Sequence, residues 1–454
     1  MAIVGAGASG ALTAINLLRA ARPDRGALRV LLIDRRASCG GVAYSTNDPR
    51  HRLNVPAGLM SAFPDAPEDF VDWRARRGGD GDPCAYAPRS EFRNYLEDTL
   101  AQAQATATPH ATLNRLVGDV VALEPGRHQT RVLLADGSAF GADAAVLAIG
   151  NLAAVPVEGC DTVLTHPRYI ADPWTPGALD RVGEPGRSVV MLIGSGLTTV
   201  DVALTLAERG HHMLAVSRGG LLPESHPSGD QGRCAPLDAS ANATSLTAAV
   251  DAALAQADAG DPRWYASVDR LRPDTQALWQ RLSLEDRQRF MTSRHRAWSV
   301  RRHRMAPQVA DALRGVLATD QLRLRRAAVE QVSARPDELD VTLTDGKRLL
   351  AGFVINCTGP GLDPRRSNEP LVRQLLDGGH ARAHPVGLGF DTFAGVLRAS
   401  ETERLYTLGP PRMGELYETT AVPEIRTQAA ELAAHLTELL AARTGDSTAL
   451  RRSA

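Results

Sequence analysis

The chain opens with a short apolar run that leads directly into a glycine-rich turn. Residues 2–4 are apolar, residues 5–10 read GAGASG, and an Ala- and Leu-rich stretch follows from 11 to about 21. A second apolar run, from 30 to 33, ends at Asp34. Short apolar runs that alternate with longer amphipathic stretches are typical of parallel strands joined by helices. We therefore predict a strand, a turn, a helix and a second strand in this part of the chain.

The glycines of this turn each meet a separate steric demand. Gly5 permits a tight turn, Gly7 lets the backbone approach a pyrophosphate, and Gly10 allows the helix to pack closely on the strand. The helix that follows presents free N–H groups and the positive end of its dipole to the phosphates. Asp34 can accept hydrogen bonds from both ribose hydroxyls, and its charge disfavours a 2′-phosphate. These residues predict a dinucleotide site that suits FAD or NAD better than NADP.

A later segment, residues 188–196, reads SVVMLIGSG: an apolar run leads into the Gly-Ser-Gly turn 194–196, and another helical stretch follows. Thr199 occupies the position of the third glycine, so this turn departs from the first one. The next apolar run ends in Ser217 and Arg218 instead of a carboxylate. These two side chains can bind a 2′-phosphate, which favours NADPH over NADH. The alternative is that Arg218 is a surface residue without a ligand.

An internal repeat indicates where each nucleotide unit closes. Residues 130–150 and 339–359 both place an Asp-Gly pair between alternating apolar residues, which is a hairpin signal. In both segments an apolar strand follows and ends at a glycine, Gly150 or Gly359. Each unit therefore has its own closing strand. Residues 405–410 are then expected to return to the first unit as its last strand.

The predicted fold is α/β, with two nested Rossmann-type dinucleotide-binding domains, the FAD domain being interrupted by the NADPH domain. The chain should end in a helix over 418–443 that begins near Val422, with Pro423 in its first turn. The expected domains are 1–185 (FAD, first part), 186–361 (NADPH, with a helical insertion at about 221–322) and 362–454 (FAD, return strand and helix).

Arginine and histidine are dense from 294 to 304 (RHRAWSVRRHR), within the insertion. A charge run of this kind is usually a solvated helix face. The alternative is that it forms a wall for NADPH phosphates or for an anionic substrate. The sequence leaves both interpretations open.

Composition narrows the class of protein. The net charge of −1 over 454 residues argues against general attraction to nucleic acid. No apolar run is long enough to span a membrane, and the first predicted strand begins at residue 2, so we expect neither a membrane anchor nor a secretory leader. The five cysteines form no CxxC pair, and we expect no metal. A cytoplasmic protein is the simplest expectation, and a homo-oligomer stays open.

Several motifs together resemble the flavin-dependent monooxygenases that use two Rossmann domains. The resemblance rests on residues 5–10, the pair Gly40-Gly41 and residues 194–201. The stretch 53–65 is similar to the loop that follows the glycine pair in flavin-containing monooxygenases. Over nearly the whole chain, the sequence resembles a bacterial family of FAD–NAD(P)-binding proteins, which is similar to the N-hydroxylating monooxygenases acting on amino-acid amines. The stretches that carry this resemblance are GGVAYST (40–46), HRLNVPAGLM (51–60), RHRMAP (302–307), INCTGPG (355–361) and LGPPRMGELYETTAVPEIRTQA (408–429).

The resemblance implies both cofactors and a reaction. NADPH would reduce FAD, and O2 would add at flavin C4a to give a hydroperoxyflavin that oxygenates an amine of a small amino-acid-like substrate. Asn54, at the position of the family's hydrogen-bond donor, would contact the flavin intermediate or NADP+. Such an intermediate persists only in a dry site with fixed donors. The alternative for Asn54 is that it caps its own loop.

Two other functions stay open: an NAD(P)H-dependent flavin reductase that inserts no oxygen, and a nucleotide-binding protein without turnover. The expected cofactors are FAD and NADPH, and the expected partners are a small substrate and O2. The expected catalytic residue is Asn54. The residues expected to bind the cofactors are Gly5, Gly7, Ser9, Gly10, Asp34, Arg35, Gly40, Gly41, Asn54, Gly150, Gly194, Ser195, Gly196, Thr198, Ser217, Arg218, Thr358, Gly359, Gly409 and Val422.

Overall fold

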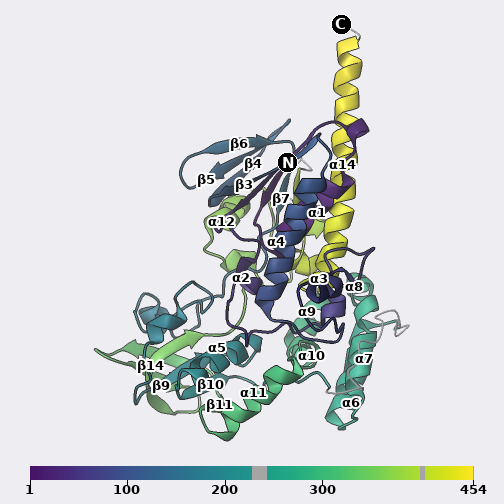
Figure 1. Ribbon diagram of the computed structural model, residues 1–454. Coiled ribbons are helices and arrows are strands. Elements are labelled where there is room, and N and C mark those ends of the chain that lie inside the picture. Colours follow the sequence, from purple (N-terminus) through teal and green to yellow (C-terminus); the bar gives the residue numbers. More distant parts are fainter. Residues whose placement is uncertain (228–242, 399–403, 453–454) are drawn as a thin grey trace.

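Two twisted sheets, each with its own helices, make up the molecule, and the chain enters the second sheet before it has completed the first. The computed structural model describes residues 1–227, 243–398 and 404–452. The first sheet lies in the upper part of Figure 1 and the second in the lower part. The order of the first sheet is β15-β16-β17-β7-β1-β2-β3. Its strands are β1 (Ala2–Val4), β2 (Leu28–Asp34), β3 (Ala111–Val117), β7 (Ala145–Leu147), β15 (Thr392–Phe393), β16 (Val396–Leu397) and β17 (Leu405–Thr407).

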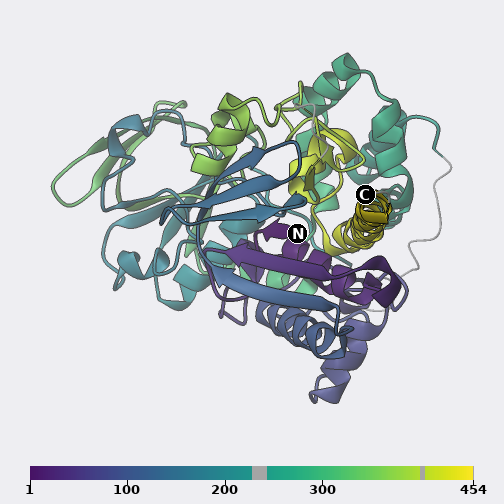
Figure 2. The same cartoon turned by 90° about the horizontal axis from the view of Figure 1, so that it is seen from above.

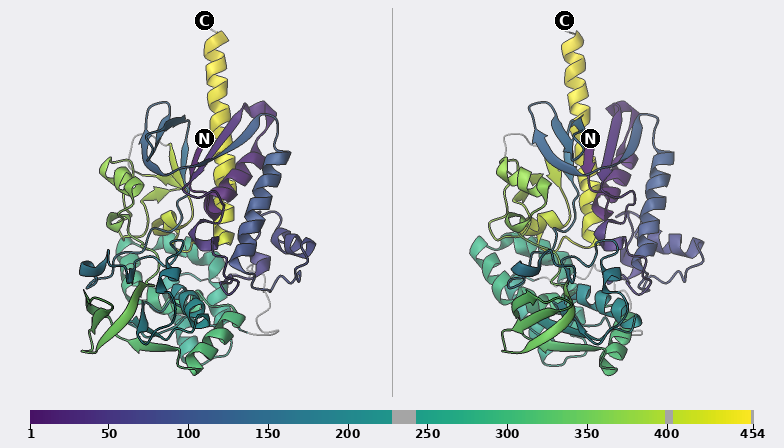
Figure 3. Two further views of the ribbon diagram at one scale, coloured as in Figure 1. Left: turned by 60° about the vertical axis from the view of Figure 1, so that its left-hand side comes forward. Right: turned by 90° about the vertical axis from the view of Figure 1, so that its left-hand side faces the viewer.

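Alternation of side chains along β1 decides which layer covers each face of the first sheet. Ile3 points into a core shared with three helices, whereas Ala2 and Val4 pack on a small antiparallel sheet. Among the helices, α1 contacts both α4 and α14 (Figure 3). The two layers are α1 (Ala8–Ala20), α4 (Arg89–Thr106) and α14 (Val422–Arg452) on one face, and β4 (Val120–Pro125), β5 (Thr130–Leu134), β6 (Ala139–Ala142) and α12 (Pro370–Asp377) on the other.

The second sheet repeats this plan around β9. Val190 and Leu192 belong to a core with two helices, while Met191 and Ile193 face the opposite side. The strand order is β11-β10-β9-β14-β13-β12, with β8 paired to β14. The elements are β8 (Tyr169–Ile170), β9 (Val189–Ile193), α5 (Leu197–Glu208), β10 (Met213–Ser217), α11 (Pro307–Ala318), β11 (Leu322–Arg326), β12 (Val329–Ala334), β13 (Leu339–Leu343) and β14 (Arg348–Asn356).

A helical insertion separates β10 from β11. Trp279, Phe290 and Trp298 form its core together with Tyr417, which belongs to the segment returning to the first sheet. The insertion therefore packs on both units, and Figure 2 shows its teal helices beside the yellow α14. Its helices are α6 (Leu246–Asp258), α7 (Trp264–Arg270), α8 (Arg272–Arg281), α9 (Leu284–Ser293) and α10 (His295–Arg302). The remaining short helices are α2 (Gly41–Tyr44), α3 (Asp69–Arg76) and α13 (Met413–Leu416).

This architecture confirms the α/β fold with two Rossmann-type sheets. The expected return strand is β17, which pairs in parallel with β7. The helix expected from residue 11 begins at Ala8, because the glycine turn leads straight into the first helical turn with Gly7 as its N-cap. The last helix begins at Val422 as expected and continues beyond 443, to Arg452.

The domain borders stay predictions, because the chain crosses between the sheets more than once. β8 lies before the expected border at 186, yet it pairs with β14 of the second sheet. No described helix combines the length and the apolar character that a membrane crossing needs.

Leu12 tests the packing of the helical layer, because it is fully buried between the first sheet and its helices. We expect Leu12→Ala to lower the free energy of unfolding by about 2–5 kcal/mol, measured by urea denaturation of the flavin-free protein. Leu284→Ala is the control, since that side chain is 52% exposed. The control should change the free energy by less than about 0.5 kcal/mol. Equal effects of the two substitutions would contradict the assigned core.

Candidate cofactor-binding site

The glycine turn between β1 and α1 brings two backbone segments into contact. Gly5 has a φ of +102°, and a Cβ there would lie 2.4 Å from the carbonyl oxygen of Ala148. A Cβ on Gly10 would lie 1.8 Å from the carbonyl oxygen of Gly5. A side chain does not fit in either space, so both positions require glycine. The first turn of α1 follows at once, and its N–H groups have no partner within the helix.

Gly41 and Asp34 both lie against this turn. A Cβ on Gly41, whose φ is +52°, would lie 2.9 Å from the Cα of Gly7. The carboxylate of Asp34 accepts hydrogen bonds from the backbone N–H of Ala6 at 2.6 Å and of Arg36 at 2.8 Å. The predicted glycine pair and the predicted acidic residue are therefore brought together at the start of α1.

The N-terminal turns of α1 and α14 meet at Gly409. A Cβ on Gly409, whose φ is +71°, would lie 2.9 Å from Oγ of Ser9 and 3.5 Å from Cγ1 of Ile425. Val422, the first residue of α14, is buried. Gly150 follows β7 with a φ of +67° and nothing within 4 Å of its Cβ position. The positive ends of two helices thus converge in the first unit.

Arg35 has a different role from its neighbours in the predicted set. Its guanidinium forms ion pairs with Asp119 at 2.7 Å and with Glu369 at 2.6 Å. The hydrogen bond with Glu369 is the main cause that raises the pKa of Arg35. Its charge is therefore matched by protein carboxylates at the end of β2.

The second glycine turn repeats the backbone contact of the first. A Cβ on Gly194, whose φ is +123°, would lie 2.3 Å from the carbonyl oxygen of Cys357. Gly196 is the N-cap of α5 and has nothing within 4 Å of its Cβ position. Ser195 and Ser217 lie side by side, with their Oγ atoms 2.8 Å apart.

The closing strand brings two further predicted residues to the second turn. The Cβ position of Gly194 lies 3.1 Å from the backbone nitrogen of Thr358, which follows β14. Gly359 comes next, with a φ of +86° and open space at its Cβ position. Thr198 lies in the first turn of α5. The residues predicted for the second nucleotide therefore share one edge of the second sheet.

Three arginines gather at the end of β10. The sequence indicated Arg218 directly and Arg296 within the run 294–304, as a possible wall for NADPH phosphates, but it did not indicate Arg326. A Cβ on Gly219 would lie 2.2 Å from a guanidinium nitrogen of Arg296. Arg326 is the register partner of Ser217 across β10 and β11. Desolvation and then the charges of Arg218 and Arg326 lower the pKa of Arg296. Within the described part of the chain, none of the three arginines forms an ion pair, so their charge is available to an anion.

Asn54 is held by its backbone. Its carbonyl oxygen accepts a hydrogen bond from Nε2 of His226 at 3.0 Å. The ring of His226 lies 5.1 Å from that of Tyr86, and burial, followed by the charge of Arg304, lowers the pKa of His226 to about 3. The amide of Asn54 makes no hydrogen bond to another described residue. Its role as a donor to a ligand stays a prediction.

The arginine-rich run of the insertion is only partly solvated. Arg302 pairs with Glu418 at 2.8 Å, with both side chains largely buried, and Arg304 is 2% exposed and pairs with Asp269 at 2.5 Å. The interpretation as a solvated face is wrong for these two arginines. Burial raises the pKa of Glu418, but the charge and hydrogen bond of Arg302 together with the charges of His303 and Arg272 outweigh it, so that pKa is lowered. The pair ties the insertion to the segment that returns to the first sheet.

Tyr417 has an unusual backbone next to this ion pair. Its φ is +61°, a conformation that costs a residue with a Cβ about 1–3 kcal/mol. Its ring stacks on Trp279 at 4.7 Å, and its hydroxyl lies 2.8 Å from Nδ1 of His295. Burial raises the pKa of Tyr417 and lowers that of His295, so both groups are neutral. The core of the insertion thus holds the return segment in place just before α14.

Cavity size does not identify the site. A small cavity of about 20 Å³ lies where Gly150, Gly361, Phe390 and Pro410 meet. A larger one, of about 300 Å³, runs along β8 and is lined by residues between 164 and 181. None of the residues predicted to bind a cofactor lines the larger cavity. Backbone geometry therefore marks the cofactor region.

The first turn, its acidic residue and its closing strand all lie in one N-terminal segment. Residues 2–152 match the model of the FAD-NAD(P)-binding family. This segment contains every strand of the first sheet except the three that return from the end of the chain. No curated protein sequence matches the chain.

Solved structures share the fold over nearly the full length. L-lysine 6-monooxygenase from Pseudomonas syringae has a TM-score of 0.65 at 16% identity, covering 97% of this chain and 99% of that one. An ornithine N-hydroxylase from Kutzneria sp. 744, described with reduced FAD, NADP+ and L-ornithine, gives 0.64 at 15% identity over 96% and 98%. Ornithine hydroxylase from Pseudomonas aeruginosa gives 0.63 at 17% identity over 96% and 98%. At these identities the likeness establishes the shared fold.

Gly10 tests the first turn, because a methyl group there meets the carbonyl oxygen of Gly5. If relief of this overlap costs about 1–3 kcal/mol, Gly10→Ala should weaken FAD binding roughly 5- to 150-fold in a fluorescence titration. The control is Gly315→Ala in α11, where the Cβ position is open. The control should keep FAD affinity and raise the free energy of unfolding by about 0.5–1 kcal/mol. Unchanged FAD affinity in Gly10→Ala would contradict the assignment of this turn.

Proposed function

We propose that the protein is an FAD-dependent, NADPH-consuming oxidoreductase that acts as a flavin monooxygenase on a small amino-acid-like amine. The observation that carries the proposal is the loop from Gly41 to Asn54. Gly41 touches the first glycine turn at Gly7, and His51, three residues before Asn54, bonds to α5 behind the second turn. The family match of residues 2–152 and the fold shared with lysine and ornithine hydroxylases support it.

FAD fits the first unit, for which we propose residues 1–185 together with 362–454. The contact of Gly10 with Gly5 leaves the start of α1 open for a pyrophosphate, and Asp34 lies beside it for the ribose. The first turn of α14 offers its positive end to the flavin ring. The residues proposed to hold FAD are Gly5, Gly7, Ser9, Gly10, Asp34, Gly40, Gly41, Gly150, Gly409 and Val422.

NADPH fits the second unit, for which we propose residues 186–361. The open N-terminus of α5 suits its pyrophosphate. The three arginines at the end of β10, which form no ion pair with a described residue, suit a 2′-phosphate. Of these arginines, Arg218 directly follows β10, whereas Arg296 comes from the insertion and Arg326 from β11, so the proposed site includes three separate segments of the chain. The residues proposed to hold NADPH are Gly194, Ser195, Gly196, Thr198, Ser217, Arg218, Arg296, Arg326, Thr358 and Gly359.

When bound, FAD supplies a hydride acceptor and the place at which O2 is activated. The chain contributes a hydrogen-bond donor in a fixed position and a packed surface that excludes water. Asn54 presents an amide that no described residue engages, and His226 fixes the backbone that carries it. The packed aromatic core of the insertion, with Tyr417, excludes water from the return segment beside it.

The proposed substrate class follows from the relatives, because Arg302 with Glu418 and Arg272 with Glu424 are buried pairs whose charges are already matched. The ornithine N-hydroxylase of the same fold is described with L-ornithine.

The spectrum of the purified protein tests the cofactor assignment. We expect the visible absorbance of oxidised flavin, and we expect NADPH to bleach it without oxygen. On return of air, a panel of amines and amino acids should contain at least one that yields a hydroxylated product in place of peroxide. Peroxide equal to the NADPH consumed with every compound would favour a reductase without oxygen insertion. A protein that binds no flavin would contradict the proposal.

Arg326 tests the choice of NADPH over NADH. Loss of one charge-assisted hydrogen bond of about 1.5–3 kcal/mol should raise the KM for NADPH roughly 10- to 150-fold in Arg326→Ala. The KM for NADH should stay within about threefold, because NADH has no 2′-phosphate. The control is Arg323→Ala on the same strand, where the guanidinium is already paired with Asp320. An equal rise of the KM for NADPH and for NADH would contradict the assignment of this phosphate site.

A further inference from the structure

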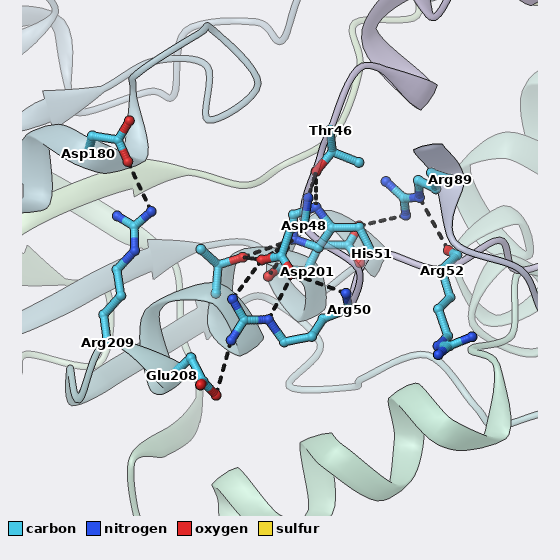
Figure 4. A network of polar contacts seen from close by, with 11 residues as sticks. Thr46, Asp48, Arg50, His51, Arg52, Arg89, Asp180, Asp201, Glu208 and Arg209 are labelled. Carbon is cyan, nitrogen blue, oxygen red and sulfur yellow. Dashed lines mark hydrogen bonds and ion pairs between the residues drawn. The ribbon is translucent and has the colours of Figure 1, made fainter. Parts of the chain in front are cut away.

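A buried polar network joins the loop that leads to Asn54 with helix α5 of the second unit (Figure 4). Nε2 of His51 lies 3.0 Å from Oγ1 of Thr205 and 3.2 Å from the carbonyl oxygen of Asp201. The hydroxyl of Thr205 donates to the carboxylate of Asp48 at 2.8 Å. We call these residues and their two partners the interdomain network: Thr46, Asp48, His51, Arg89, Asp201 and Thr205.

Each hydrogen in the centre of this network points at an acceptor, and the one on Nε2 of His51 faces two. Because the hydroxyl of Thr205 donates to Asp48, it accepts from His51, which places the ring proton on Nε2. The hydroxyl of Thr46 then donates to Nδ1 of the same ring at 2.7 Å. Burial raises the pKa of Asp48, but hydrogen bonds from Arg50 and Thr205 outweigh it and bring that pKa to about 2. The carboxylate is therefore charged, and each hydrogen bond of the network pairs a donor with an acceptor.

An ion pair extends the network toward the start of α5. Arg89, the first residue of α4, pairs with Asp201 at 2.6 Å, where the side chains are 17% and 5% exposed. The ring of Trp174 covers both contacts, 5.6 Å from the ring of His51 and 5.7 Å from the guanidinium of Arg89. At the solvent end, Arg50 reaches Glu208 at 3.1 Å. Helix α5 is thus held to the first unit along most of its length.

The position of this network relates it to the proposed reaction. α5 begins at Gly196, at the second glycine turn, and His51 lies three residues before Asn54. The network therefore connects the helix that begins at the proposed NADPH site with the loop that leads to the proposed flavin site. Contacts between units of one chain usually permit relative motion, whereas a buried and fully satisfied network permits one geometry.

We propose that the interdomain network holds the second nucleotide unit in one orientation over the first, so that hydride passes without a rotation of the units. His51, Asp201 and Thr205 are then positioning residues, which act through the placement of α5. This inference rests on the proposed function, since it assumes a hydride donor in the second unit.

Thr205→Val tests the inference, because valine keeps the shape of threonine and removes the hydroxyl. His51 and Asp48 then lose a shared partner. Thr205→Ser is the conservative rescue, since serine restores the hydroxyl. The matched control is Asp180→Asn, which breaks an exposed ion pair of Asp180 with Arg209 at the end of α5 and leaves the interdomain network intact (Figure 4).

Two measurements report the result. In Thr205→Val, amide hydrogen exchange of residues 46–54 and of α5 should speed up at least about tenfold, with or without flavin. Anaerobic hydride transfer from NADPH should slow on the order of 100-fold. The dissociation constant of NADPH should change less than about threefold, because the residues proposed to bind NADPH are unchanged. Thr205→Ser and Asp180→Asn should resemble the wild type in both measurements.

Several outcomes would overturn the inference. Hydride transfer at the wild-type rate in Thr205→Val would do so, and so would a serine variant as slow as the valine variant. If Thr205→Val does not fold, Asp201→Asn keeps the side-chain volume, removes the charge from the Arg89 pair and is measured in the same way. If the wild type accepts no hydride from NADPH, the proposed function fails. The exchange rates then still decide whether the network fixes α5 to the loop.

Discussion

Backbone packed directly on backbone, without room for one Cβ, places the start of a helix at the edge of each sheet. At Gly10 a methyl group would fall 1.8 Å from the carbonyl oxygen of Gly5, and at Gly194 it would fall 2.3 Å from that of Cys357. The first contact brings α1 against the end of β1, and the second brings the turn before α5 against the backbone that follows β14. Unpaired N–H groups of each first helical turn then face the edge of the sheet. Both proposed nucleotide sites depend on this closeness, because a helix set back by a side chain would move its dipole away from the phosphates.

One loop connects these two edges and the insertion. Gly41 packs on Gly7, His51 bonds to Thr205 on α5, and Asn54 accepts a hydrogen bond from His226. A short stretch of chain therefore has its position set by three separate parts of the molecule. Such a loop has little freedom, which suits a donor that must meet a ligand at a fixed place.

Charged side chains have two distinct roles in this protein. Buried pairs such as Arg89 with Asp201 and Arg302 with Glu418 join parts of the chain that are far apart in sequence. Removal of one partner of such a pair leaves an uncompensated buried charge, so these pairs fix the arrangement more than they add to stability. The arginines at the end of β10 differ, because they gather near solvent without a carboxylate in the described part of the chain. An anion bound there, such as the 2′-phosphate proposed above, would relieve their mutual repulsion.

The sequence by itself determined the parts whose physical cause is local. Glycine spacing, apolar runs and the Asp-Gly hairpins specified both turns, their helices and the closing strands, since each depends on steric limits within a few residues. Sequence also indicated Asp34, Arg218 and Asn54. Only the tertiary structure decided what joins them. Arg326 reaches Ser217 through the register of β10 and β11, and His51 meets Asp201 across a separation of 150 residues. Such contacts follow from how whole units pack, which no local pattern of residues encodes.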